Sequence, residues 1–390
     1  MNTPSVIFSV GVGIPGEGMG NHAYHLIQGL ERHHLLLRGF VMQVRKNGNA
    51  LPSIHATYFI EKMAYRLARY TGINQYVLRD NGFDWWVARQ LHAATIFYGW
   101  THHALWSLKK AKKLKMLTVL ERANAHPLTY SRLLEAEYRK YGLTDRPYHP
   151  LILKKHLQEL EVADYIAVTS QFTKQSLLEH GIDEQRILLT PLGVDVEHFT
   201  PDMPAKLQFR GTDETFRVLY VGQLCLRKGV QYLLEAWHTL QLKYAKLVLV
   251  GDLLPEFKNI LHDALACDQG RTIRVAAHVD DPVALYQQAS VCILPTLEDG
   301  FGLVVLEAMA CGVPVIITEH TGAKDCVRHG LDGFIIPPYC SESIAETLTY
   351  CYDHREQLHT MGVQARQQAC HFPWRCYQDG IAHHLHAITT

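Results

Sequence analysis

The sequence lacks the features that mark secreted, membrane-spanning and nucleic-acid-binding proteins. Its nine cysteines are an odd number, all lie between Cys225 and Cys376, and none forms a C-x-x-C pair, which favours reduced thiols over a disulfide framework. The N-terminus has no basic signal-peptide region, and no run approaches the ~18 apolar residues of a membrane span. The sequence contains 38 basic (Lys+Arg) and 38 acidic (Asp+Glu) residues, so its net charge of zero favours binding to neither nucleic acid nor membrane. We therefore expect a cytoplasmic protein that does not bind nucleic acid.

The sequence has instead the pattern of an α/β protein in two parts. Its 390 residues exceed one ordinary core, so two domains of roughly 200 residues are expected. Short apolar runs alternate with helical patterns, which is typical of parallel sheets covered on both faces. The expected strands are 5–10, 35–42, 94–99, 114–120 and 164–170 in the first half, and 216–222, 246–251, 272–277, 290–295 and 313–318 in the second.

A segment rich in Pro and Gly, "TPLGVDVEHFTPDMP" at 190–204, separates the two halves and is predicted to be a linker. Doubly wound sheets bind ligands beyond the carboxyl ends of their strands. The expected ligand site is therefore the cleft between the two domains.

The first glycine-rich loop, "GVGIPGEGMGNH" at 11–22, follows a predicted strand and contains G-x-G-x-x-G, the dinucleotide fingerprint. A nicotinamide site would also need an acidic residue after the second strand, but none occurs between Glu31 and Glu61. Nearby arginines could suit a 2′-phosphate, and the glycines could serve only close packing. We favour an open loop in which the backbone at Gly16 and Gly18 meets a ligand.

A pair of cations, Arg227 and Lys228, lies in "YVGQLCLRKGVQYLLEAW" (220–237), between a strand end and a helix predicted to begin near Gly229. Cations at a helix N-terminus oppose the helix dipole unless they share an anion. A bound diphosphate would be such an anion, held by the helix amides and both side chains. The alternative is a pair of solvated charges.

A single charge, Glu307, interrupts the apolar helical stretch within "TLEDGFGLVVLEAMACGVPVI" (296–316). A helix that is apolar all round is normally buried, and a buried carboxylate needs a partner. Glu307 could accept hydrogen bonds from a vicinal diol such as a ribose, or it could have a structural arginine or backbone partner. Gly300 and Gly302 keep the preceding turn free of side chains, so phosphates or hydroxyls could approach this helix N-terminus.

Residues 216–338 resemble the donor-binding domain of the retaining GT-B glycosyltransferases of family GT4. The matching pieces are 222–229, 299–316 and 321–338, with weaker similarity at 168–182, 192–201, the first glycine loop and 372–385. The resemblance implies an α/β fold of two doubly wound Rossmann-like domains facing across a cleft. It places an acceptor-side domain at 1–197 and a donor-binding domain at 198–372, with the helix 373–390 packing back on the first.

The resemblance also implies roles for residues on the donor side. Glu307 matches the second acid of the E-x7-E motif, which binds the donor ribose. Asp299 matches the first acid, which stabilises charge at the sugar, and strand alternation predicts that only one of Asp299 and its neighbour Glu298 faces the cleft. Lys228 matches the cation on the diphosphate. The expected donor-binding residues are Glu307, Arg227, Gln223, Gly222, Gly300, Phe301, Gly302 and Leu303, with Gly16 and Gly18 of the first loop.

Two family positions depart from their usual residues. The first acid of the motif is Asp299 rather than Glu, and the expected arginine is Gln223 here, for which Arg227 could compensate. On the acceptor side, "TVLERANAHP" (118–127) offers Glu121, Arg122 and His126. We expect Asp299, Lys228, His126 and Glu121 to be the catalytic residues. No Asp-x-Asp, HExxH or Walker A sequence occurs, so no metal and no cofactor beyond the nucleotide-sugar donor is expected.

The lysine-rich stretch "LKKAKKLK" (108–115) is predicted to be a solvated helix face. It could alternatively dock Lys109–Lys115 on an anionic membrane that carries a lipid-linked acceptor. The expected activity is transfer of a sugar, with retained configuration, to an acceptor hydroxyl on a carbohydrate or lipid-linked molecule. A nucleotide-sugar epimerase and a non-catalytic nucleotide-sugar-binding protein are the alternatives.

Overall fold

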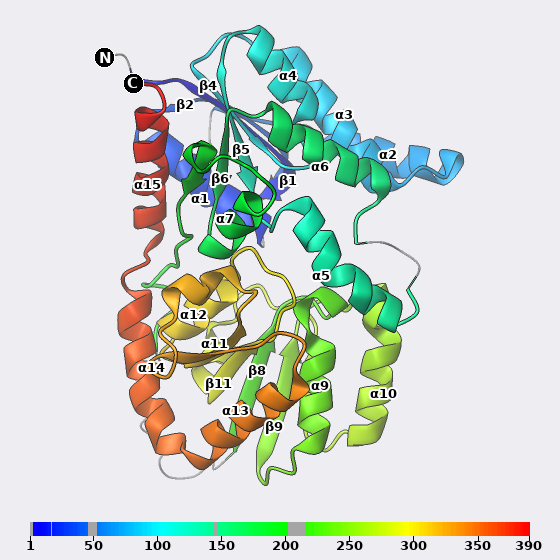
Figure 1. The fold of residues 1–390 in the computed structure, drawn as a ribbon, viewed down its shortest axis with the longest axis vertical. Coiled ribbons are helices and arrows are strands. Elements are labelled where there is room, and N and C mark those ends of the chain that lie inside the picture. Colours follow the sequence, from blue (N-terminus) through cyan, green and yellow to red (C-terminus); the bar gives the residue numbers. More distant parts are fainter. Residues whose placement is uncertain (1–2, 17, 46–52, 144–146, 202–214) are drawn as a thin grey trace.

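A computed structural model describes residues 3–16, 18–45, 53–143, 147–201 and 215–390. Two parallel sheets lie one above the other, and helices cover both faces of each (Figure 1). The predicted α/β fold with two Rossmann-like domains is confirmed. Among the described residues, no helix is both long and apolar enough to cross a membrane.

The N-terminal sheet has seven parallel strands in the order β3-β2-β1-β4-β5-β6-β7. Its strands are β1 (Val6–Ile14), β2 (Leu36–Val44), β3 (Ile54–Ala56), β4 (Ile96–Trp100), β5 (Leu117–Arg122), β6 (Tyr165–Val168) and β7 (Ile187–Leu189). The helices of this half are α1 (Met19–Arg32), α2 (Tyr58–Thr71), α3 (Gln75–Gln90), α4 (Leu105–Lys113), α5 (Pro127–Lys140), α6 (Pro150–Val162) and α7 (Gln171–Leu178).

The C-terminal sheet has six parallel strands in the order β10-β9-β8-β11-β12-β13. They are β8 (Phe216–Val221), β9 (Ala245–Val250), β10 (Ile273–Ala276), β11 (Val291–Leu294), β12 (Val315–Thr318) and β13 (Gly333–Ile336). The accompanying helices are α9 (Val230–Thr239), α10 (Lys258–Asp268), α11 (Val283–Gln288), α12 (Leu303–Ala310), α13 (Ser341–Asp353), α14 (Arg355–Ala369) and α15 (Trp374–Ala387).

Every strand predicted from an apolar run is present, with ends shifted by a few residues. The structure adds β3, β7 and β13, which have three or four residues each and lie at sheet edges. β3 and β7 have only three residues, too few to show a strand period, and β13 begins at Gly333 directly after a turn, so no apolar run marks its start.

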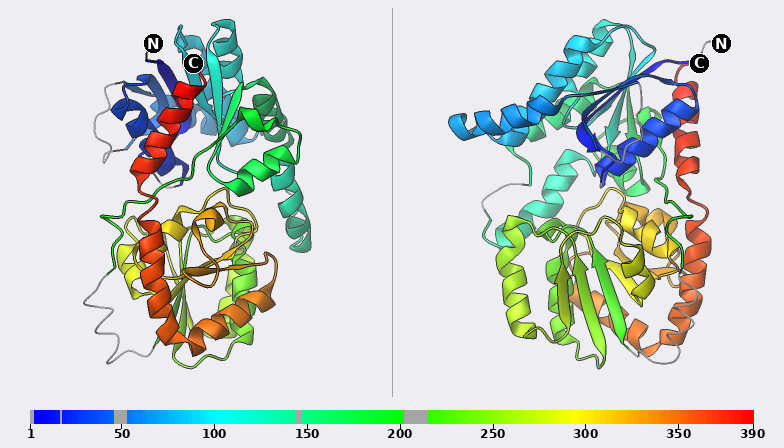
Figure 2. Two further views of the ribbon diagram at one scale, coloured as in Figure 1. Left: turned by 60° about the vertical axis from the view of Figure 1, so that its left-hand side comes forward. Right: turned by 180° about the vertical axis from the view of Figure 1, so that it is seen from behind.

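The chain crosses between the two halves twice, at neighbouring positions. The Val194 N–H donates to the Phe372 carbonyl at 2.9 Å, so the linker and the return crossing lie side by side. Beyond this crossing α15 packs on α1, where His22 bonds the Tyr377 hydroxyl at 2.6 Å and His25 stacks on Trp374. Figure 2 shows α15 (red) on the N-terminal half and α14 (orange) on the C-terminal half. Residues 202–204 of the predicted linker lie outside the described residues.

Helix α5 belongs to the N-terminal half but extends along the C-terminal one (Figure 1). The Glu137 carboxylate accepts hydrogen bonds from Gln231 Nε2 at 3.0 Å and from the Tyr232 hydroxyl at 2.8 Å, both on α9. The Tyr339 hydroxyl donates to the Leu133 carbonyl at 2.8 Å. The two halves are therefore in direct contact beside the predicted cleft.

Candidate active site

The turn after β11 is the place where the C-terminal half meets the N-terminal half. The Gly300 carbonyl accepts a hydrogen bond from Ser170 Oγ at 2.7 Å, at the N-terminus of α7. A Cβ atom on Gly300 would lie 1.7 Å from the Ala123 carbonyl oxygen. In this structure the backbone after β5 therefore occupies the space beside Gly300, and the role of Gly300 in donor binding stays a prediction.

Asp299 and Lys228 form an ion pair at this interface. The Asp299 and Lys228 side chains are 13% and 14% exposed, so the pair is accessible from the space between the domains. Burial by itself would raise the pKa of Asp299, but Lys228 and Arg227 outweigh it and hold that pKa below its usual value. The pair combines an ionised acid and a cation at the ends of β8 and β11.

Glu298 points across the interface rather than back into its own domain. Its carboxylate is fully buried and accepts hydrogen bonds from the Ala125 N–H at 2.9 Å and from Asn124 Nδ2 at 3.1 Å. Strand alternation does not govern Glu298 and Asp299, because β11 ends at Leu294. Both acids therefore lie at the interface, where Glu298 bonds the opposite domain and Asp299 pairs with Lys228.

Arg227 is bound to the same acidic turn. Its Nη1 donates to the Glu298 carbonyl at 2.9 Å and lies 3.6 Å from the Glu298 carboxylate. Gln223 is exposed, and its own carbonyl accepts a hydrogen bond from the Tyr220 hydroxyl at 2.6 Å. Arg227 thus supports Glu298, and it does not occupy the place of the family arginine at Gln223.

Glu307 lies on α12 with its side chain directed at α11. Its Oε2 accepts a hydrogen bond from the Tyr286 hydroxyl at 2.9 Å. Burial raises the pKa of Glu307 to about 7, and this bond together with the charge of His198 on the linker only partly offsets the increase. The partner is a tyrosine, which the spacing of the sequence could not indicate.

The three acceptor-side candidates do not converge on one point. Glu121 points toward α1 and α15, where it accepts a hydrogen bond from the Tyr98 hydroxyl and lies 3.8 Å from His22. Burial raises the pKa of Glu121 to about 8. Arg122 donates to the carbonyl oxygens of residues 124 and 125, so it fixes the loop that bonds Glu298.

His126 has a structural role at the start of α5. It caps α5, because its Nδ1 accepts the Leu128 N–H at 3.3 Å, and its ring stacks on His180. Burial, together with the neighbouring His180 and Arg122, lowers the pKa of His126 to about 3. A neutral imidazole is therefore expected at physiological pH.

The first glycine loop is closely packed at some of its glycines and open to solvent space at another. Cβ atoms on Gly16 and Gly20 would lie 2.9 and 2.6 Å from the Gly13 carbonyl oxygen, so these glycines allow the loop to pack against the start of α1. Gly18 precedes α1 with a φ of +48°, and a Cβ atom there would meet no neighbouring atom within 4 Å. The backbone at Gly18 is the open part of this loop.

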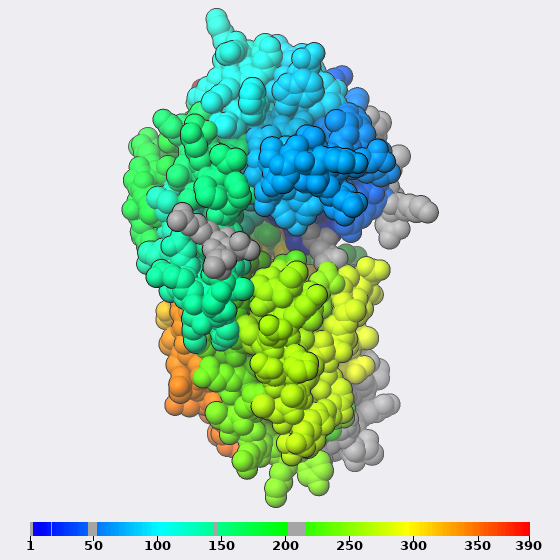
Figure 3. All heavy atoms as spheres, turned by 90° about the vertical axis from the view of Figure 1, so that its right-hand side faces the viewer, coloured from blue at the N-terminus to red at the C-terminus, as the bar shows by residue number. Residues whose placement is uncertain are grey.

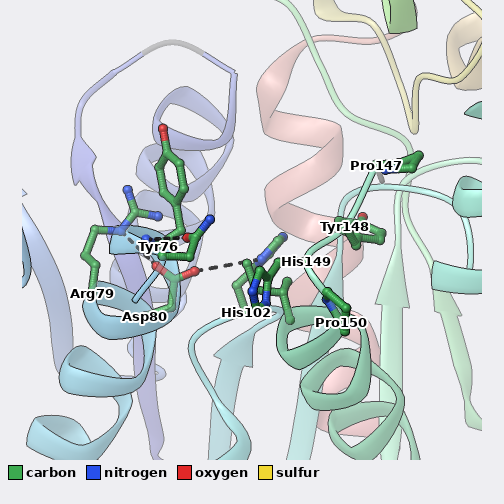
Figure 4. Close-up of a pocket in the computed structure, with 10 residues that line it drawn as sticks. Tyr76, Arg79, Asp80, His102, Pro147, Tyr148, His149 and Pro150 are labelled. Atoms are coloured by element: carbon green, nitrogen blue, oxygen red, sulfur yellow. Dashed lines mark hydrogen bonds and ion pairs between the residues drawn. The ribbon is translucent and has the colours of Figure 1, made fainter. Parts of the chain in front are cut away.

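A polar pocket of about 570 Å³, here called the α3–α6 pocket, was not predicted from the sequence. Arg79 and Asp80 of α3 face His102 and Tyr148 across it (Figure 4). Arg79 Nε bonds Asp80 at 2.8 Å. Burial would raise the pKa of Asp80, but His103, Arg79 and His102 together hold that pKa well below its usual range.

The loop carrying His102 is held in an unusual backbone conformation. Its φ of +80° is rare for a residue other than glycine, and such geometry tends to occur at functional sites. The buried Glu159 accepts the N–H groups of His102 and Ala104 at 2.9 and 3.0 Å, and His156 bonds the His102 ring at 2.9 Å. These contacts hold the His102 ring in place beside the pocket.

Two stacked tyrosines connect this pocket with the turn after β11. Tyr148 of the pocket stacks on Tyr130 with 4.5 Å between ring centroids, and Tyr130 interacts electrostatically with Arg227 and Glu298. Within the described residues, no group of three or more His, Cys, Asp or Glu side chains could hold a metal ion. The site thus brings together acids, cations and hydroxyl-bearing side chains from both domains.

Comparisons with known proteins agree with this architecture. Over 230 residues the chain is 28% identical to the capsular polysaccharide biosynthesis glycosyltransferase CapM of Staphylococcus aureus, covering 57% of this chain and 60% of that protein. It is 30% identical over 222 residues to a D-inositol 3-phosphate glycosyltransferase of Pseudarthrobacter chlorophenolicus, covering 54% and 53%. The matches thus span between half and two thirds of these relatives.

Solved structures share the whole fold. A crystal structure of Anabaena HepE in complex with UDP matches 98% of this chain and 100% of its own, at 18% identity and a TM-score of 0.69. Sucrose-phosphate synthase of Thermosynechococcus elongatus matches 99% of both chains at 19% identity and a TM-score of 0.72. The family model described as "Glycosyl transferases group 1" matches residues 202–368, so the C-terminal part of the chain is similar to that family, and the whole chain has the GT-B fold.

Proposed function

We propose that this protein transfers a sugar from a nucleoside-diphosphate sugar to an acceptor hydroxyl with retention of configuration. The accessible Asp299–Lys228 pair carries the proposal, because it lies at the ends of β8 and β11 within a domain that is similar to a glycosyltransferase family. The resemblance to family GT4 supports retention. The complex of the similar HepE structure with UDP makes uridine nucleotides the first donors to test.

In the proposed mechanism the protein stabilises the departing diphosphate by charge and by amide dipoles. Lys228 neutralises the phosphates, and the N-termini of α9, α12 and α1, each preceded by a glycine, are proposed to supply the amides. Asp299 stabilises positive charge as it develops on the sugar. Preorganised electrostatics of this kind supplies much of the rate enhancement in many enzymes.

The proposed acceptor site is the α3–α6 pocket. Its aromatic walls suit the faces of a sugar ring, and Arg79, Asp80 and His102 offer donors and acceptors for hydroxyl groups. The stacked Tyr130 and Tyr148 connect this pocket with the turn that carries Glu298, which supports the proposal. His126 and Glu121, which bond within the N-terminal half, are proposed to position the neighbouring loops rather than to contact the reacting atoms.

Replacing Arg79 tests the acceptor site. We expect Arg79→Gln to raise the acceptor KM on the order of tenfold, because one charge-assisted hydrogen bond is lost, while slow donor hydrolysis stays unchanged. Arg89→Gln on the same helix is the matched control, because Arg89 lies over Trp85 and outside the pocket. Equal KM values for the two variants would argue against this acceptor site.

The pKa of Glu307 predicts a pH dependence of donor binding. The ionised carboxylate accepts ribose hydroxyls better than the protonated one, so the donor KM is expected to fall as pH rises through about 7. Between pH 6 and 8 the decrease should be on the order of tenfold, set by the ionised fraction. Glu307→Gln should raise the KM and remove this pH dependence. A flat wild-type profile would contradict the proposed role of Glu307.

The mechanism assigns no step to a metal ion. Activity is therefore expected to persist in EDTA, because Lys228 and the helix amides neutralise the diphosphate. Initial rates with and without EDTA, and after addition of Mg²⁺ or Mn²⁺, measure this. Complete loss in EDTA with recovery on adding either ion would rule out the metal-independent mechanism.

The proposed function itself is tested with a panel of nucleotide sugars, each incubated with and without carbohydrate acceptors. Release of nucleoside diphosphate together with a glycosylated acceptor of retained configuration, identified by NMR, is expected. Conversion of the nucleotide sugar without an acceptor would instead indicate an epimerase. Thermal stabilisation by a nucleotide sugar without any product would indicate a binding protein.

A further inference from the structure

Helix α2 exposes an unusual amount of apolar surface. It projects from the N-terminal half (Figure 1), and of its 14 residues only Ile60 and Ala64 are buried. Phe59, Met63 and Tyr70 are 54%, 62% and 89% exposed. An apolar side chain that is exposed singly is normal, but several on one short helix indicate a surface that contacts something else.

Four of the six exposed large apolar side chains of α2 lie on one side of the helix. Phe59, Met63, Leu67 and Tyr70 follow the spacing i, i+4, i+8 and i+11, which places them along a single line of the helix surface. We call these four residues the apolar stripe. It lies beside the buried Ile60 and Ala64, but its own four side chains are between 49% and 89% exposed, so the fold itself does not cover it.

Three cations run beside the apolar stripe. Lys62, Arg66 and Arg69, here called the basic stripe, follow the spacing i, i+4 and i+7 and are all exposed. Within the described part of the chain, none of the three makes an ion pair. An apolar line flanked by long cationic side chains is the arrangement of helices that lie in a membrane interface, where the cations reach lipid headgroups.

The position of α2 connects this surface with the proposed acceptor site. Residues of α2 and α3 line a second hollow of about 510 Å³, and Tyr76 and Arg79 belong to both this hollow and the α3–α6 pocket. Figure 3 shows α2 (blue) on the outer surface, above the opening between the two halves. A molecule held at α2 would therefore lie next to the pocket.

The lysine-rich helix α4 differs from α2 because its apolar side chains beside the lysines are buried. Leu105, Leu108 and Ala111 are buried against the domain, and Lys112 pairs with Asp164. The exposed lysines of α4 thus lack the apolar line that α2 has beside its cations. They fit the solvated helix face expected from the sequence.

We propose that α2 docks the protein on anionic phospholipid bilayers, with the apolar stripe among the acyl chains and the basic stripe on the headgroups. The charge pattern of α2 identifies the occupant, because three cations beside the stripe, without ion-pair partners in the described part of the chain, match an anionic surface. The proposal concerns a membrane surface and does not depend on the proposed sugar transfer.

Sedimentation with vesicles tests this proposal on the full chain. Wild-type protein is expected to bind phosphatidylcholine vesicles that contain phosphatidylglycerol, and to bind pure phosphatidylcholine vesicles at least about tenfold more weakly. Replacing Lys62, Arg66 and Arg69 together by Gln should weaken binding to the anionic vesicles about a hundredfold. Replacing Phe59, Met63 and Tyr70 together by Ser should likewise reduce binding at least about tenfold.

The matched control replaces Lys109, Lys110 and Lys113 of α4 by Gln, which removes as many charges and should leave vesicle binding unchanged. Circular dichroism of every variant checks that the fold is intact. A single substitution, Phe59→Trp, adds a second readout, because its fluorescence should shift to the blue only with anionic vesicles. Three outcomes would overturn the proposal. The wild-type protein could fail to bind anionic vesicles, it could bind neutral vesicles equally well, or binding could be lost only in the α4 variant.

Discussion

Lys228→Gln is expected to lower kcat for sugar transfer by a hundredfold or more, on the order of 3 kcal/mol of transition-state stabilisation. The side chain is the accessible cation of the Asp299–Lys228 pair. Negative charge accumulates on the diphosphate only as the bond to the sugar breaks, so kcat should fall more than the donor KM rises. Steady-state kinetics with the best donor from the panel measures both values.

Two further variants distinguish the effect on kcat of removing a charge at the site from the effect of removing a charge elsewhere in the domain. Lys246→Gln on β9 removes an exposed lysine of the same domain and should leave kcat unchanged. Asp299→Asn should lower kcat by about a hundredfold, and the double variant with Lys228→Gln should lose less than the product of the single effects, because the two groups act as a pair. A Lys228→Gln protein with near wild-type kcat would refute the assigned role.

Gly300→Ala is expected to reduce activity by more than about a hundredfold, because misplacement by one ångström can cost that much. The new methyl group would lie 1.7 Å from the Ala123 carbonyl oxygen, where backbone atoms of the other domain cannot yield without moving the domains apart. The contact lies between the domains and outside either core. The thermal midpoint should therefore change much less than the activity does.

Small-angle scattering measures the expected separation as a larger radius of gyration for Gly300→Ala. Gly82→Ala is the matched control, because its new methyl group meets only the end of the Ile60 side chain at 3.2 Å within the N-terminal half. If Gly300→Ala had wild-type activity and scattering, the close approach of the domains at this turn would have no part in function.

The sequence pattern predicts the interior of each sheet and misses three of the four edge strands. Central strands such as β1 and β8 are buried on both faces, so they appear as continuous apolar runs. The edge strands β3 and β7 have only three residues, too few for a usable period, and β13 begins at a glycine, so pairing with a neighbour rather than an apolar run defines these three strands. The fold class follows from the long central runs, and the sheet edges depend on tertiary contacts.

The site is predictable only where its residues share a local motif. Asp299, Lys228 and Glu307 each lie beside a glycine turn or a helix start, so their surroundings are encoded nearby in the sequence. Tyr286 and Ser170 contact these segments through space from distant elements, and no spacing identifies them. The "TS" pair before α7 indicates a helix cap at Ser170, but it does not indicate that the same hydroxyl bonds Gly300.

The packing of α15 on α1 has a consequence for synthesis on the ribosome. Helix α1 emerges early, but its partner α15 follows only after the whole C-terminal domain has been translated. Until then the α1 surface around His22 and His25 lacks Tyr377 and Trp374. The nascent N-terminal domain therefore remains incomplete while its neighbour forms. A premature stop codon just before residue 374 would impair the first domain to be made as well as the last segment.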